Sequence, residues 1–183
     1  MLHIKCGDGV GKTTSAVGQA VRMLGYNKKV IFVQFMKDGL SGEINFLKNN
    51  SNIYVLHPTG PIKFIWNMTD SEKSALKDIH TNLIKETEKI LKSEHISMVV
   101  FDEFNSANEL NLLDKDYAYK LICEYKDKTE IILTGRNPEE KYVEISDYIS
   151  EINCIKHPFE SGVNARKGIE SVSYTHLTLP TSD

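Results

Sequence analysis

The sequence lacks the features of a disulfide-stapled, membrane-spanning or polyanion-binding protein. Only three of its 183 residues are cysteines, with no CxxC pair and no His/Cys cluster, which is typical of reduced thiols in a cytosolic protein. No apolar run approaches the length of a membrane span, and the first strand follows Met1 so closely that no signal peptide is expected. A net charge of -3 gives no electrostatic attraction to nucleic acid or to an anionic membrane. We therefore expect a cytoplasmic protein with neither nucleic acid nor a membrane as its partner.

The most informative feature that is present is a glycine-rich loop between a short apolar stretch and a helical pattern. Its residues are Gly7, Asp8, Gly9, Val10, Gly11, Lys12, Thr13 and Thr14. Strand, glycine loop and helix in this order make a phosphate cradle, where loop amides, the helix N-terminus and Lys12 face the anion. Thr13 offers a hydroxyl to Mg²⁺. The usual spacing would place the first glycine at position 6, where this chain has Cys6, so we interpret the loop as a P-loop variant.

The apolar pattern of the chain predicts alternating strands and helices. We expect strands over residues 2–6, 30–35, 53–56, 98–101 and 131–134 and within 148–155. We expect helices over 16–24 with Gly25 as the stop, over 43–48, from a capping box at 69–72 to about residue 91, and over 117–125. Asn137 and Pro138 are predicted as N-cap and N1 of a further helix. This alternation predicts one α/β domain with a mostly parallel sheet and helices on both faces.

The C-terminal residues 171–183 do not continue this pattern. They have no amphipathic period, follow a charged segment abruptly, and resemble one reading frame of a transposon-type sequencing adapter. We interpret them as a non-native tail, an adapter-like translation artefact, and assign the domain to residues 1–170. A genuine edge strand or flexible tail is the alternative.

Asp102 and Glu103 follow a buried apolar strand and form the second half of the expected nucleotide site. The carboxyl ends of parallel strands line one crevice, where carboxylates can hold Mg²⁺ against phosphates. Asp102 is either a direct ligand or a residue one step behind the metal. Arg136, at the end of another strand, points towards the same crevice; it either stabilises phosphate charge or is a surface arginine beside a helix cap.

A loop over residues 57–68 carries Phe64 and Trp66 between prolines and a glycine. Bulky aromatic residues in a loop are commonly a hydrophobic plug beneath it, and less commonly a platform for a ligand. The pattern of the loop alone favours the plug.

Together these segments resemble the ATP:corrinoid adenosyltransferases of the CobA/CobO/BtuR type. The resemblance rests on motifs that occur in the family's order and cover nearly the whole chain to residue 170. They are the glycine loop at 7–14, Val-Gln-Phe-Met-Lys at 33–37, Phe-x-Trp at 64–66, Phe-Asp-Glu at 101–103, Leu-Thr-Gly-Arg-Asn at 133–137, Lys-His-Pro-Phe at 156–159 and Ala-Arg-Lys-Gly-Ile-Glu at 165–170.

This resemblance implies a RecA-like P-loop fold, usually dimeric, that moves the 5′-deoxyadenosyl group of ATP onto a Co(I) corrinoid and releases triphosphate. The Co(I) centre is itself the nucleophile, which agrees with the lack of a Ser/His or Cys/His pair in the sequence. Lys12, the loop amides and Mg²⁺ (or Mn²⁺) on Thr13 and Glu103 would stabilise the leaving triphosphate. Phe64 and Trp66 would displace the lower axial base of the corrinoid, and this implication reverses the preference for a plug. A flavodoxin-type or other reductant protein is the expected partner for producing Co(I).

One departure from the family pattern concerns Val10, where the family commonly carries lysine, so that one phosphate-facing cation is missing. Two other functions remain as alternatives. A P-loop ATPase or kinase would release phosphate or ADP, and a non-catalytic ATP-binding module would release nothing.

Overall fold

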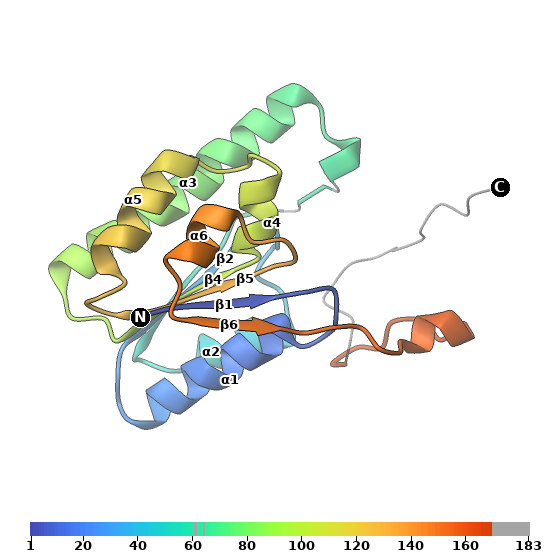
Figure 1. Cartoon of the computed structure of the whole chain (residues 1–183), viewed down its shortest axis with the longest axis horizontal. Coiled ribbons are helices and arrows are strands. Elements are labelled where there is room, and N and C mark those ends of the chain that lie inside the picture. Colours follow the sequence, from blue (N-terminus) through green and yellow to red (C-terminus); the bar gives the residue numbers. More distant parts are fainter. Residues whose placement is uncertain (61, 64, 170–183) are drawn as a thin grey trace.

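The structure is a computed structural model that describes residues 1–60, 62–63 and 65–169. Its described strands form one six-stranded sheet in the order β3-β2-β4-β5-β1-β6, with every neighbouring pair parallel (Figure 1). The strands are β1 (Leu2–Cys6), β2 (Val30–Gln34), β3 (Ile53–Leu56), β4 (Met98–Asp102), β5 (Glu130–Thr134) and β6 (Tyr148–Glu151). The predicted strands and their parallel arrangement are therefore confirmed.

The strands alternate with helices, most of which were predicted. The helices are α1 (Lys12–Gly25), α2 (Gly42–Leu47), α3 (Asp70–Ser93), α4 (Phe104–Glu109), α5 (Lys115–Tyr125) and α6 (Glu140–Glu144), with 3₁₀ turns η1 (Ile65–Asn67) and η2 (Pro158–Ser161). The predicted capping box opens α3: the Thr69 hydroxyl accepts the Glu72 N–H, and the Glu72 carboxylate accepts the Thr69 N–H. Among the described residues, no helix combines the length and apolar character needed to cross a membrane.

Helices cover both faces of the sheet, as the sequence predicted (Figure 1). Alternate residues of each central strand point to opposite faces. Phe32 of β2 joins the core beneath α1 and α2, whereas its neighbours Ile31 and Val33 join the larger core beneath α3, α4, α5 and α6. Because both faces are covered, the central strands consist of continuous apolar runs.

One predicted helix start is wrong. Asn137 and Pro138 do not open a helix; α6 begins at Glu140, with Glu139 as its N-cap. The Asn137 side-chain amide instead donates to the Glu109 carboxylate at 3.0 Å, so it ties the segment after β5 to the end of α4. Helix α4 itself was not predicted.

Each apolar strand near the centre of the sheet ends in a polar residue at the same edge. Gln34 ends β2 and is the register partner of Asp102, which ends β4; Thr134 ends β5. The loop after β1 leaves from this edge as well, because all strands run in the same direction. The carboxyl edge of the sheet therefore gathers the predicted phosphate and metal residues.

Candidate nucleotide and metal site

The loop between β1 and α1 has the backbone conformation that its glycines allow. Gly7 and Gly11 have φ angles of 96° and 114°, which residues with a side chain rarely adopt. The Gly7 N–H donates to the Arg136 carbonyl at 3.2 Å, and the Gly9 N–H donates to the Ile152 carbonyl at 2.7 Å. The loop is therefore fixed to the segments that follow β5 and β6.

Close packing against the chain after β6 explains why two of these glycines have no room for a side chain. A Cβ atom at Gly7 would lie 2.4 Å from the Ile152 carbonyl oxygen, and one at Gly9 would lie 2.8 Å from Asn153. Asp8 adds a third tie, because its carboxylate accepts the Cys154 N–H at 2.9 Å, a bond that lowers the pKa of Asp8. Asp8 was predicted to bind the nucleotide; in the structure its carboxylate ties the loop to the backbone at Cys154.

Helix α1 begins directly after the loop, and its first turn presents backbone N–H groups and a lysine. Gly11 is the N-cap, and the first turn contains Lys12, Thr13 and the exposed Thr14 but no acidic residue. The Lys12 ammonium donates to the Gly9 carbonyl at 2.7 Å, and partial burial lowers the pKa of this lysine. Val10 is 62% exposed. The amides of this first turn and Lys12 can together receive an anionic group.

The carboxylate of Asp102 is fully buried at the centre of a hydrogen-bonded cluster. Its Oδ1 accepts the hydroxyls of Thr13 and Thr134, each at 2.7 Å. Its Oδ2 accepts the Lys37 ammonium at 2.9 Å and the Gln34 amide at 3.3 Å. Burial alone would raise the pKa of Asp102, but the Lys37 charge and these hydrogen bonds outweigh it and the pKa is lowered. Asp102 is therefore an anion with four donors around it.

The structure brings the predicted residues Thr13 and Asp102 together. It adds three residues around Asp102 that sequence reasoning missed, Gln34, Lys37 and Thr134. Gln34 and Thr134 could have been found, because each is the polar residue that ends a buried strand at the shared edge. Lys37 had been noted only as part of the 33–37 motif.

Glu103 follows Asp102 in a left-handed backbone conformation, with φ 59°. Its N–H donates to the Thr134 hydroxyl at 2.9 Å, and its Oε2 accepts the Ser106 hydroxyl at 3.0 Å. Its Oε1 lies 3.5 Å from the Lys37 ammonium. A non-glycine residue keeps this conformation only where surrounding contacts hold it, and such residues are found most often at functional sites.

The residues predicted to hold Mg²⁺ lie together and offer the chemistry that this ion prefers. The side chains of Thr13, Asp102 and Glu103 carry only oxygen atoms as possible metal ligands, and the Lys37 ammonium lies among them. Over residues 1–60, 62–63 and 65–169, no group of three His, Cys, Asp or Glu side chains could hold an ion. Mg²⁺ is commonly held by one or two carboxylates together with substrate phosphates and water, and the oxygens of Thr13, Asp102 and Glu103 fit such an ion.

The remaining predicted site residues are less closely integrated. Arg136 is exposed after β5, and its charge contributes to lowering the pKa of both Lys12 and Asp8, so it lies near the loop. Trp66 lies in η1 and is 73% exposed. Phe64 lies outside the described residues, as does the predicted non-native tail over 171–183.

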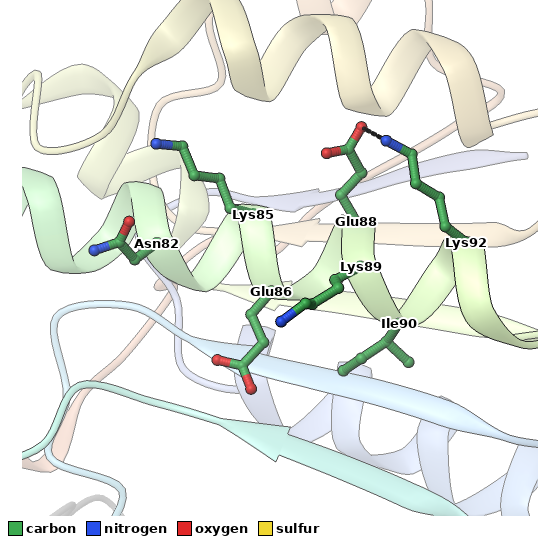
Figure 2. A pocket seen from close by; sticks show the side chains of 7 residues that line it. All are labelled: Asn82, Lys85, Glu86, Glu88, Lys89, Ile90 and Lys92. Carbon is green, nitrogen blue, oxygen red and sulfur yellow. Dashed lines mark ion pairs between the residues drawn. The ribbon is translucent and has the colours of Figure 1, made fainter.

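A separate hollow on the outer surface of α3 contains none of the predicted site residues (Figure 2). All of its lining residues belong to that one helix, and Glu88 and Lys92 form an ion pair of 2.8 Å across one turn there. Most of its side chains are charged and exposed, and it lies apart from the glycine loop and Asp102, so we assign it no part in the site.

The parallel sheet, the glycine loop before α1 and the Thr13–Asp102 hydrogen bond define a P-loop nucleotide-binding protein. Within this class, the chain belongs to the ATP:corrinoid adenosyltransferase family BtuR/CobO/CobP, whose sequence model matches residues 1–171. This assignment confirms the resemblance and the enzyme class that the motifs predicted.

Individual relatives support the same assignment along nearly the whole chain. A corrinoid adenosyltransferase of Escherichia coli (strain K12) is 30% identical over 173 residues, which cover 93% of this chain and 85% of that protein. Corrinoid adenosyltransferases of Pseudomonas aeruginosa and Sinorhizobium sp are 30% and 28% identical; each match covers 93% of this chain, and 83% and 79% of those proteins.

Proposed function

We propose that the chain transfers the 5′-deoxyadenosyl group of ATP to the Co(I) centre of a corrinoid through the residues gathered at the carboxyl edge of its sheet. The electron pair of Co(I) forms the bond to C5′, the C5′–oxygen bond breaks, and its electron pair leaves on triphosphate. The observation that carries this proposal is the open N-terminus of α1 beside the Thr13–Asp102 hydrogen bond. The N-terminus of α1 offers a binding place for the leaving triphosphate. The reaction requires no nucleophile from the protein, because Co(I) is the nucleophile.

The backbone amides at the N-terminus of α1, Lys12 and Arg136 bind the triphosphate in this proposal, whereas the Gly7 and Gly9 amides keep their bonds to the Arg136 and Ile152 carbonyls. Amides at a helix N-terminus carry a partial positive charge that costs no reorganisation during the reaction. Lys12 exchanges its hydrogen bond to the Gly9 carbonyl for a phosphate oxygen, and Arg136 adds a cation from the end of β5. Val10 contributes its backbone N–H.

Thr13 and Glu103 would hold Mg²⁺ or Mn²⁺, with Asp102 behind them. The Thr13 hydroxyl donates its hydrogen bond to the Asp102 carboxylate, so its oxygen lone pairs, one of which accepts the Lys37 ammonium in the structure, point away from Asp102 and can face the ion. When bound, the ion supplies positive charge against the phosphate oxygens and so favours departure of triphosphate.

Trp66 and Phe64 are proposed to contact the corrinoid. The support for Trp66 is its large exposed ring in the short η1 turn, on a loop that follows the carboxyl end of β3 (Figure 1). An aromatic face against cobalt excludes water as a ligand, which keeps the metal four-coordinate and makes Co(II) easier to reduce. The homodimer and the reductant protein remain predictions from the resemblance, and the cytoplasmic location remains a prediction from the composition of the sequence.

One experiment distinguishes this function from its alternatives. The protein is incubated with ATP, Mg²⁺ and chemically reduced cob(I)alamin, and the products are separated. We expect adenosylcobalamin and triphosphate in equal amounts. Formation of ADP or phosphate would indicate a kinase or ATPase instead, and ATP binding without any product would indicate a binding module.

A further inference from the structure

Lys37 occupies a position among the oxygen atoms that we assign to the metal. Its ammonium lies 2.9 Å from Asp102 Oδ2, 3.3 Å from Thr13 Oγ1 and 3.5 Å from Glu103 Oε1. The side chain is only 8% exposed. All three residues of the proposed metal site therefore already surround a cation.

A metal ion added to the same oxygen atoms would lie close to this ammonium. Mg²⁺ binds oxygen ligands at about 2.1 Å, so an ion on Thr13 and Glu103 would lie within a few ångströms of the Lys37 ammonium. Repulsion between two such close cations is strong where the surroundings are poor in water. Movement of the ammonium away from the ion would relieve this repulsion.

We propose that Lys37 holds the cation position while the metal is absent, and that Mg²⁺ displaces its ammonium when the ion enters with ATP. This inference rests on the proposed function, because that function assigns the metal to Thr13 and Glu103. The backbone beside Lys37 is anchored, since the Met36 N–H donates to the buried His80 imidazole at 3.1 Å. The displacement is therefore a movement of the lysine side chain.

Two consequences follow for metal binding. Asp102 is fully buried and keeps a counter-charge when no metal is present, which a buried carboxylate requires. Without ATP, the metal ion must compete with the Lys37 ammonium for the same oxygen atoms. With ATP, the negative phosphates attract the ammonium away from these oxygen atoms and so favour entry of the ion. Metal binding to the free protein is therefore weak and is strengthened by ATP.

The test measures Mn²⁺ binding without ATP by electron paramagnetic resonance titration of the full chain. Lys37→Gln and Lys37→Met remove the charge, and the Gln variant keeps a donor to Asp102. We expect both to bind Mn²⁺ at least about tenfold more tightly than the unmodified protein, a difference of about 1.4 kcal/mol. Lys37→Arg retains the charge and should bind Mn²⁺ no more tightly than the unmodified protein. Lys29→Gln is the control for net charge. Lys29 precedes the first residue of β2, at the end of the strand away from the site, and pairs with Glu94.

Unchanged or weaker Mn²⁺ binding by the Gln variant would overturn the inference. If the neutral variants do not fold, the ¹⁵N signal of the Lys37 ammonium in the unmodified protein decides: it should differ between ATP alone and ATP with Mg²⁺, and identical signals refute displacement. The proposed function fails separately, when the unmodified protein forms no adenosylcobalamin. Mg²⁺-dependent product together with unchanged Mn²⁺ binding by the Gln variant would refute only the role of Lys37.

Discussion

At the scale of single residues, Asp102 concentrates more interactions than any one motif suggests. Its four donors come from β2, the loop after β2, α1 and β5, so the carboxylate connects four segments of the chain. A buried ion pair of this kind contributes little net stability when intact, but loss of one partner leaves the other charge uncompensated.

We therefore expect Asp102→Asn to lower the free energy of unfolding by about 3 kcal/mol in the absence of metal. Urea denaturation at neutral pH measures the change. Asp102→Asn combined with Lys37→Met should lose less than the sum of the two single variants, because no charge is then stranded. Glu94→Gln removes the charge of a partly exposed partner of Lys29 and Tyr54 and should have a much smaller effect. A loss below about 1 kcal/mol for Asp102→Asn would contradict this account of the cluster.

His80 is the second residue whose burial has a measurable consequence. Its Nδ1 donates to the Leu112 carbonyl at 2.8 Å and its Nε2 accepts the Met36 N–H, so the ring is neutral. Burial lowers the pKa of His80 to about 4, against about 6.5 in the unfolded chain. Between these values the unfolded chain binds the extra proton, so stability is lost as the pH falls.

This group should reduce the free energy of unfolding by about 2 kcal/mol between pH 7 and pH 5. Urea denaturation at the two pH values tests the expectation: the pH dependence of His80→Gln should be smaller by this amount. His95→Gln is the matched control, because His95 is exposed, and it should keep the dependence of the unmodified protein. Equal dependence in all three proteins would mean that His80 does not titrate as described.

The site could be predicted from the sequence where it depends on strand ends, and not where it depends on the turn after β2. Thr13, Asp102 and Glu103 were placed together because parallel strands finish at one edge. The position of Lys37 depends on Met36, which has a φ of 55° and whose N–H donates to the imidazole of His80, a residue far away in the sequence. No local pattern records that contact.

At the scale of elements, the loop between β1 and α1 depends on its contact with the segment after β6. Gly7→Ala should destabilise the protein by at least about 1 kcal/mol, because the residue has a positive φ and its Cβ would collide with the Ile152 carbonyl. Thermal unfolding measures the effect. Gly18→Ala is the matched control: the added Cβ has open space within α1 and should stabilise the helix by up to about 1 kcal/mol. If Gly7→Ala is as stable as the unmodified protein, the contact does not shape the loop.

The elements that sequence reasoning missed are those whose ends depend on tertiary contacts. The predicted start of a helix at Asn137 followed an ordinary rule for N-caps, but the Asn137 amide is engaged by Glu109. Glu109 belongs to α4, which has six residues and begins after the left-handed Glu103. Helix α3, by contrast, carries its own start signal, the capping box of Thr69 and Glu72, and was predicted from it.

At the scale of the whole molecule, the parallel strands give the protein two unlike edges. The carboxyl edge carries the glycine loop and the Asp102 cluster, and the loop with Trp66 follows β3 at that edge. The amino edge carries the chain reversal after α1, where Tyr26 is 76% exposed. An exposed aromatic residue at each edge allows the corrinoid proposal to be tested against a matched position.

Trp66→Ala should impair the enzyme selectively when Co(II) must be reduced on the protein. We expect a loss on the order of tenfold or more in that assay, and a smaller loss when Co(I) is supplied chemically, because the ring acts on cobalt coordination rather than on ATP. Rates of adenosylcobalamin formation in the two assays measure the difference. Tyr26→Ala removes a similarly exposed ring at the opposite edge and should change neither rate. Equal losses for Trp66→Ala in both assays would favour the plug over the corrinoid contact, since a structural defect impairs both reactions alike.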